Sequence, residues 1–193
     1  NVWVTDVGRH LVWKFDAHGV LLMTLGVDGA SACDERHFGQ PTHVCVAPSG
    51  EFFVTDGYGN SRVVKIAPGG HWLKWTGSWG TGANQFNIVH SIATDRQDRV
   101  YAADRNNHRI QVYDNDLNFV RSITGIGAPW GLCIPTKPDA QGRRMLAPQE
   151  LAFALSYALT DAPPSGNPVI REALEKNQLE TKADVEKVVR QML

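Results

Sequence analysis

The stretch that decides the fold is residues 51–77, "EFFVTDGYGNSRVVKIAPGGHWLKWTG". It begins with a strand-like apolar run, turns at "DGYGNS" and continues into a second run, "RVVKI". After the turn "APGG", a third run, "HWLKWT", ends at Gly77. Short runs of β-branched and aromatic residues between turns rich in Gly, Pro, Asn and Asp are typical of antiparallel strands. The stretch therefore predicts three consecutive strands.

Two other segments repeat this pattern, at residues 2–26 and 99–125. The aspartates that end the first strand of each unit, which we call the repeat aspartates, lie 50 and 48 residues apart: Asp6, Asp56 and Asp104. One more short strand precedes the second and third units, in "THVCVAP" and "HSIATD". Four strands for every ~40–50 residues indicate the blades of a β-propeller.

The pattern changes near residue 134. The segment "APWGLCI", residues 128–134, resembles the inner strand of a fourth blade, and the polar stretch "TKPDAQGRR" follows it. We predict a mainly β partial propeller of about three four-stranded blades over 1–134, a linker over 135–146 and an α-helical segment over 147–193. In the last segment, Asn167 is expected to cap a helix that starts at Pro168, and Thr181 with Asp184 forms a variant capping box.

Composition excludes some classes of protein. The chain has 42% hydrophobic and 20% charged residues and a net charge of −1, which predicts no nucleic-acid partner. Since no apolar run approaches the ~20 residues of a membrane helix, we predict no membrane span. Three cysteines without C-x-x-C spacing leave the redox compartment open. The chain opens within a strand-like run, "NVWVT", so we expect the natural N-terminus to lie upstream.

The repeats resemble a known family. "DGYGNSRVVKI" and "ADRNNHRIQVYD" are similar to NHL repeats, which form β-propellers, and the similarity covers residues 1–134. The segment from "HFGQPTHVCVAP" to "RIQVYD" resembles the peptidyl-α-hydroxyglycine α-amidating lyases. This resemblance implies a six-bladed propeller with zinc on its axis and a structural calcium nearby. The tail segments "RRMLAPQELAFALSYALTDAPP" and "VEKVVRQML" resemble the helical domains of planctomycete-type cytochrome-associated proteins and imply no chemistry.

Tyr58 is the first candidate site residue. It lies between Gly57 and Gly59 at the end of a predicted strand, and flanking glycines indicate a close backbone approach or unusual dihedral angles. Taken alone, the residue is compatible with a turn whose ring covers the propeller face. The resemblance implies that Tyr58 is the catalytic tyrosine of the family.

His90 is the second candidate. Counting back 14 residues from Asp104 gives His90, and the same count from Asp56 gives Thr42, so we expect both side chains to face the central channel. The resemblance implies that His90 is one of three zinc-binding histidines, the others falling before and after this chain. Val89 departs from the family, which usually has proline there. A lone histidine without a metal remains the alternative.

The other histidines are weaker candidates. His43 lies one residue beyond the channel position, and the rest are expected to be solvated in turns or at strand edges: His10, His18, His37, His71 and His108.

Arg105 is the third candidate. It follows the third repeat aspartate in "ADR", where the family has an arginine that binds the substrate carboxylate. A planar guanidinium group matches a planar carboxylate in geometry and charge. The polar residues that recur in both later repeats are expected to be structural: Asn60, Arg62, Asn107 and Arg109.

Together these residues imply a peptidylamidoglycolate lyase-like, metal-dependent carbon–nitrogen lyase. Its substrate would be a peptide ending in α-hydroxyglycine, and its products a peptide amide and glyoxylate. Zinc would polarise the substrate oxygens, Tyr58 would remove the hydroxyl proton, and Arg105 would hold the carboxylate. Because a phenol has a pKa of about 10, the base needs neighbouring positive charge. The alternative is a non-catalytic NHL propeller whose loop face binds a protein or another ligand.

We also expect the chain to be an incomplete or fused fragment. Half a propeller leaves two sheet faces uncovered, and closure is what protects such blades. Because the chain lacks two of the three zinc ligands that the resemblance implies, the chain alone is expected to be inactive or to need self-association. Both resemblances imply an extracytoplasmic location, secreted or periplasmic, and the resemblance of the tail implies a bacterial protein.

Overall fold

The computed structural model describes residues 1–134, 151–152, 155 and 164–192. The chain divides into two compact units, Asn1–Leu132 and Cys133–Leu193. The predicted linker at 135–146 lies outside the described residues, as does the start of the predicted helical segment.

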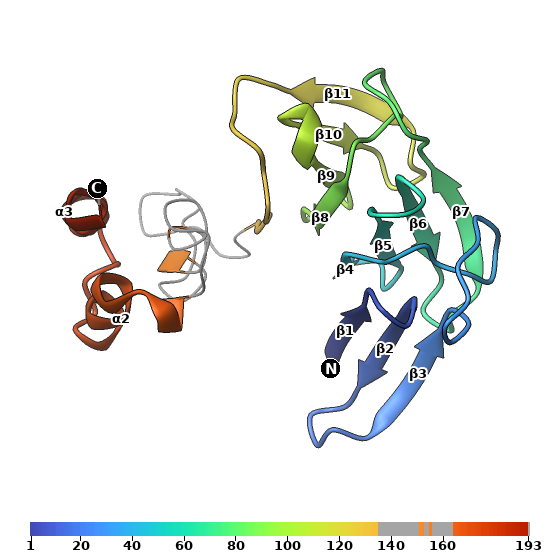
Figure 1. The fold of residues 1–193 in the computed structure, drawn as a ribbon, viewed down its shortest axis with the longest axis horizontal. Helices are drawn as coiled ribbons and strands as arrows, with labels where there is room; N and C mark the ends of the chain where they lie inside the picture. Colours follow the sequence, from blue (N-terminus) through green and yellow to red (C-terminus); the bar gives the residue numbers. More distant parts are fainter. Residues whose placement is uncertain (135–150, 153–154, 156–163, 193) are drawn as a thin grey trace. The chain divides into compact units, whose positions relative to one another are not determined.

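The first unit consists of three antiparallel sheets, seen as a fan in Figure 1. The first sheet has the order β1-β2-β3, with bounds Val2–Asp6, Leu11–Phe15 and Leu21–Leu25. The second has the order β4-β5-β6-β7, with bounds His43–Val46, Phe52–Asp56, Arg62–Ile66 and Trp72–Thr76. The third joins β8, β9, β10 and β11, with bounds Val89–Thr94, Val100–Asp104, Arg109–Tyr113 and Phe119–Ile123.

These sheets confirm the prediction of a mainly β propeller-type fold, with one difference. The first sheet contains three strands rather than four, because no described residue provides the counterpart of β4 or β8. In the two complete sheets, the strand that precedes the repeat-aspartate strand is an edge strand, and it pairs only with that strand.

The second sheet is buried on both faces, which explains its apolar sequence. Every residue of β5 and β6 is buried. Because side chains alternate across a strand, Phe52 and Val54 contact the cluster on the side of the first sheet, whereas Phe53 contacts the cluster on the side of the third. The second sheet is thus the layer against which both neighbours pack.

The innermost strands of the fan are β1, β4 and β8 (Figure 1). Side chains link them across the sheets: Thr5 Oγ1 donates to the carbonyl oxygen of Thr42 at 3.2 Å, and Thr42 Oγ1 donates to that of Val89 at 2.8 Å. The sheets are therefore fixed together at the side where a propeller has its channel.

The expectation of a fourth inner strand at residues 128–134 is wrong. This segment has no strand structure, because no strand among the described residues pairs with it. Two other bonds hold it to β8: the carbonyl oxygen of Trp130 lies 2.7 Å from His90 Nδ1, and Leu132 N donates to Ser91 Oγ at 3.0 Å. The segment is thus anchored beside β8 by side chains.

The second unit is helical where it is described. It contains the 3₁₀ turn η2, Pro164–Gly166, and the helices α2, Pro168–Glu175, and α3, Lys182–Met192. Both predicted caps are present: Asn167 Oδ1 accepts from Ile170 N at 3.2 Å, and Thr181 Oγ1 accepts from Asp184 N at 3.2 Å. Its apolar core consists of Ala152, Ile170, Ala173, Leu179 and Val188. Each helix in the described part of the chain is too short or too polar to cross a bilayer.

Candidate functional site

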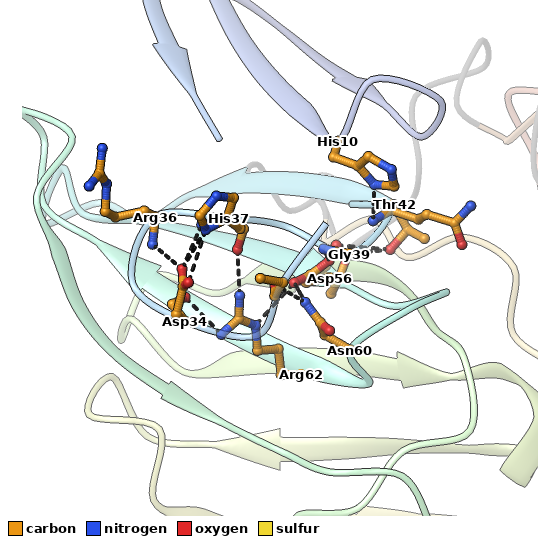
Figure 2. A network of polar contacts seen from close by, with 12 residues as sticks. His10, Asp34, Arg36, His37, Gly39, Thr42, Asp56, Asn60 and Arg62 are labelled. Carbon is orange, nitrogen blue, oxygen red and sulfur yellow. Dashed lines mark hydrogen bonds and ion pairs between the residues drawn. The ribbon is translucent and has the colours of Figure 1, made fainter. Parts of the chain in front are cut away.

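The repeat aspartate of the second sheet organises a network of polar contacts, shown in Figure 2. Asp56 is fully buried and accepts hydrogen bonds from Gly39 N at 2.7 Å, Asn60 Nδ2 at 2.7 Å and Arg62 Nε at 3.0 Å. Burial raises the pKa of Asp56, while the bonds from Asn60 and the charge of Arg62 act in the opposite direction. The buried charge is therefore paired rather than isolated.

Arg62 connects this network to the loop that links the first two sheets. Its side chain is fully buried, and its two terminal nitrogens donate to the carbonyl oxygens of Asp34 at 3.0 Å and His37 at 2.7 Å. All three nitrogens of the guanidinium group are thus used within the protein. We call Asp56, Asn60 and Arg62 the linker clamp of the second sheet.

The third sheet has an equivalent linker clamp, formed by Asp104, Asn107 and Arg109. Asp104 accepts from Asn107 Nδ2 at 2.8 Å and from Arg109 Nε at 2.7 Å. The terminal nitrogens of Arg109 donate to the carbonyl oxygens of Thr81, Gly82 and Gln85 at 2.7 to 2.8 Å. These contacts agree with the structural role expected for the recurring asparagines and arginines.

The loop around Tyr58 is held by backbone packing at its two glycines. A Cβ atom on Gly57 would lie 1.9 Å from the carbonyl oxygen of Val89, and one on Gly59 would lie 2.4 Å from that of Gly39. The expected close backbone approach is therefore present at both glycines. Because Val89 directly precedes His90, the Tyr58 loop is fixed against the strand that carries the histidine.

His90 occupies an irregular position in β8. Val89 pairs with Asp104 and Ser91 pairs with Ala103, so His90 is an extra residue without a partner on β9. Such bulges redirect a side chain and are common beside active sites. Two residues earlier, Ile88 has a φ of 60°, which is unusual for a β-branched residue and marks local backbone strain. The sequence analysis missed both features.

The bulge brings His90 to Tyr58 and Trp130. His90 Nε2 lies 3.1 Å from the Tyr58 hydroxyl oxygen, and Nδ1 lies 2.7 Å from the Trp130 carbonyl oxygen. Since a carbonyl oxygen can only accept, Nδ1 carries the proton. Burial lowers the pKa of His90, and the positive charge of Arg105 adds to this effect, against the hydrogen bond to Trp130. The neutral ring thus presents the lone pair of Nε2 to Tyr58.

Arg105 completes this group. Its guanidinium carbon lies 4.0 Å from the centroid of the Trp130 ring and 6.0 Å from that of Tyr58. Its Nε donates to Asn106 Oδ1 at 3.2 Å, and within the described part of the chain no acidic side chain forms an ion pair with it. The three predicted site residues therefore lie together, with Trp130 as a fourth member. We call Tyr58, His90, Arg105 and Trp130 the aromatic cluster.

Other histidines lie outside the aromatic cluster. His43 Nδ1 lies 3.1 Å from the Ile92 carbonyl oxygen, so His43 bridges β4 and β8. His10 and His37 are half-buried, and their Nδ1 atoms bond to Gln40 N and to Asp34, which corrects the expectation that they are simply solvated. His18, His71 and His108 are exposed, as expected.

The metal expectation can be compared with the residues present. His90 Nε2 has the chemistry of a zinc ligand, because the other ring nitrogen is held by a carbonyl oxygen. However, no group of three His, Cys, Asp or Glu side chains in the described part of the chain is placed to hold a metal ion. These residues therefore supply one ligand of the three that a catalytic zinc site needs.

Comparisons with known proteins agree with the repeats and the propeller-type fold. The NHL repeat family model matches residues 38–66 and 86–113. The peptidylglycine alpha-amidating monooxygenase of Rattus norvegicus is 44% identical over 133 residues, which cover 64% of this chain and 14% of that protein. The probable peptidyl-alpha-hydroxyglycine alpha-amidating lyase pgal-1 of Caenorhabditis elegans is 39% identical over 123 residues, which cover 61% of this chain and 35% of that protein.

A relative of a different kind matches more of the chain. The NHL repeat-containing protein 3 of Mus musculus is 36% identical over 181 residues, which cover 86% of this chain and 50% of that protein. The chain thus spans half or less of the length of each of these relatives.

Solved structures show the same fold. A streptogramin B lyase covers 72% of this chain and 42% of its own, with a TM-score of 0.52 and 16% identity. The hydrazine synthase of Kuenenia stuttgartiensis covers 72% of this chain and 36% of its own, with a TM-score of 0.50 and 17% identity. The chain therefore carries two NHL repeats in a propeller-type unit and resembles the hydroxyglycine amidating lyases.

Proposed function

We propose that the aromatic cluster is part of a carbon–nitrogen lyase site for peptides that end in α-hydroxyglycine. The observation that carries this proposal is the position of Arg105. Its cation is stacked on an aromatic ring, next to the Tyr58–His90 pair, without an acidic partner among the described residues. A cation held in this way is suited to bind a carboxylate.

The residues of the cluster account for the steps of the cleavage. Arg105 binds the carboxylate of the terminal hydroxyglycine. Tyr58 first loses its own proton to solvent and then, acting as the phenolate, removes the proton of the substrate hydroxyl group. The O–H electron pair then forms the C=O bond of glyoxylate. The C–N pair moves to nitrogen, which takes up a proton as the peptide amide leaves.

A metal ion would add to this chemistry. We propose that His90 Nε2 provides one zinc ligand and that ligands outside the described residues complete the site. When bound, zinc would polarise a substrate oxygen and stabilise the phenolate. The structural calcium and the extracytoplasmic location implied by the resemblance also remain proposals.

The experiment compares the wild-type chain with Tyr58→Phe on benzoyl-α-hydroxyglycine. Glyoxylate and benzamide are measured with zinc present, over a range of protein concentrations that extends to those at which the chain would self-associate. We expect glyoxylate release above the spontaneous rate, in a 1:1 ratio to benzamide, and a loss of about 100-fold or more in Tyr58→Phe, because general-base steps contribute factors of this size.

The matched control is Tyr101→Phe, which removes a tyrosine hydroxyl of β9 that bonds to Asp95. It should keep the wild-type rate. Equal glyoxylate release by the wild type, Tyr58→Phe and a sample without protein would contradict the lyase proposal. Binding of a folded protein partner to the loop face, without glyoxylate release, would favour the scaffold alternative.

A further inference from the structure

Trp130 contacts the arginine and the histidine of the aromatic cluster. Its ring lies 4.0 Å from the guanidinium carbon of Arg105 and 5.0 Å from the centroid of the His90 ring, at an interplanar angle of 70°. Its carbonyl oxygen bonds to His90 Nδ1 at 2.7 Å. One residue therefore contacts the cation through its side chain and the histidine through both its side chain and its backbone.

The burial of Trp130 indicates that this contact is not part of the apolar core. Its side chain is 41% exposed, and it is absent from the core clusters between the sheets. The segment around it forms no strand, yet the bond from Leu132 N to Ser91 Oγ holds it beside β8. Because Trp130 lies outside the core, its contacts with Arg105 and His90 do not contribute to core packing, and we infer that they hold these two side chains in place.

Two other arginines, Arg62 and Arg109, are held in a different way from Arg105. Arg62 and Arg109 are positioned by a carboxylate and by carbonyl oxygens that fill their guanidinium groups. Arg105 is positioned by stacking, which leaves the terminal nitrogens available to a ligand. An acidic partner would have neutralised the same cation.

We propose that Trp130 is the positioning residue of this site: its ring holds the Arg105 guanidinium in place for a carboxylate, and its carbonyl oxygen fixes the tautomer of His90. The second half of this role rests on the proposed function, because only there does the lone pair of His90 Nε2 act. Trp130 itself touches neither proton that moves in the reaction. Its substitution therefore changes geometry and binding before it changes chemistry.

The test uses the full chain and three variants: Trp130→Ala, Trp130→Phe and Trp79→Ala. Trp79 is 74% exposed and is the matched control for loss of an indole ring. Circular dichroism verifies that each variant is folded. Histidine ¹⁵N spectra report the tautomer of His90, assigned by its absence in His90→Gln. Arginine Nε–H shifts report the ring current of Trp130 on Arg105, and calorimetry reports the affinity for benzoylglycine.

In the wild type and in Trp79→Ala, we expect a protonated Nδ1 and a ring-shifted Arg105 Nε–H signal. In Trp130→Ala, the ring shift should vanish and the affinity for benzoylglycine should fall about fivefold or more. The backbone carbonyl oxygen remains in this variant, but the ring contacts with Arg105 and His90 that hold it against Nδ1 are lost, so the His90 signals should move to a mixture of tautomers. Trp130→Phe should recover most of the affinity, because a phenyl ring still stacks on the guanidinium group.

Unchanged histidine and arginine spectra in Trp130→Ala would overturn the positioning role, even if the wild type binds benzoylglycine. If the spectra change as expected but the wild type does not cleave benzoyl-α-hydroxyglycine, the positioning role stands and the lyase proposal fails. The two ideas are therefore tested separately.

Discussion

Arg105 and Arg109 lie four residues apart on one turn, and their surroundings are opposite. The guanidinium group of Arg109 donates hydrogen bonds to Asp104 and to carbonyl oxygens of the preceding loop. That of Arg105 is stacked on Trp130 and bonds only to Asn106 among the described residues. The two arginines therefore have different roles. Arg109, in the linker clamp of the third sheet, fixes the preceding loop, whereas Arg105, in the aromatic cluster, keeps its cation available to a ligand.

The linker clamps and the aromatic cluster should respond differently to substitution. The aspartates of both clamps are fully buried and paired with an arginine, so loss of that arginine leaves an unpaired buried charge. The aromatic cluster is half-exposed, so its substitution should alter ligand binding and leave the free energy of unfolding nearly unchanged. Each prediction below tests this difference.

The largest expected effect is on the clamp. Arg62→Ala leaves Asp56 buried without its cation and frees two carbonyl oxygens, so the free energy of unfolding should fall by about 3–5 kcal/mol. Urea unfolding followed by circular dichroism measures it. Arg9→Ala removes an exposed pair with Asp28 and is the matched control, with little change expected. Similar stabilities of the two variants would contradict the clamp.

A smaller effect on stability is expected at Gly57, which lies between Asp56 of the linker clamp and Tyr58 of the aromatic cluster. In Gly57→Ala the new Cβ atom would contact the Val89 carbonyl oxygen, so the Tyr58 loop must move away from β8. We expect a loss of about 1–3 kcal/mol in stability and a loss of benzoylglycine binding. Gly69→Ala, at a turn where nothing lies within 4 Å, should change neither. Retained binding in Gly57→Ala would show that the cluster does not need this contact.

The smallest effect concerns Tyr113, whose pKa is affected by Asp104 of the linker clamp of the third sheet. The Tyr113 hydroxyl is buried, and no group in the described part of the chain bonds to it. Tyr113→Phe removes this unpaired group and should raise the free energy of unfolding by about 1 kcal/mol. A loss of several kcal/mol would instead reveal a partner of the hydroxyl group.

The same residue predicts a pH dependence. Burial raises the pKa of Tyr113, and the charge of Asp104 raises it further. The native state therefore holds this proton above the pKa of about 10 that the unfolded chain has. Because the unfolded chain releases this proton above pH 10 while the native state keeps it, the free energy of unfolding falls as the pH rises above 10. In Tyr113→Phe, urea unfolding between pH 9 and 11 should lose less stability than in the wild type.

Much of the fold follows from the sequence because its signals are local and repeated. The repeat aspartates set the spacing of the sheets, and the consecutive apolar residues of β5 and β6 reflect burial on both faces. The glycines beside Tyr58 correctly predicted that the backbone of this loop lies close to other backbone segments. The inner-strand prediction at 128–134 failed because a strand needs a pairing partner, which local sequence does not show.

The site was only partly predictable for the same reason. Tyr58, His90 and Arg105 were chosen one by one from their motifs, and the structure brings them together. The bulge at His90 arises from the pairing between β8 and β9, and the left-handed conformation of Ile88 lies just before that strand. Trp130 lies within the segment that was predicted as an inner strand, residues 128–134, and was not predicted as a site residue. Its contacts with Arg105 and His90 depend on tertiary structure, which the local sequence does not show.

The most direct test of the central claim is the binding of benzoylglycine to the wild type, Arg105→Ala and Arg96→Ala, measured by calorimetry. Arg96 is exposed and serves as the control for a lost surface charge. We expect Arg105→Ala to lower the affinity by about tenfold or more, as for a lost charged hydrogen bond, without a change in stability. Arg96→Ala should bind like the wild type. Equal affinities in all three proteins would contradict the claim that Arg105 is held ready for a carboxylate.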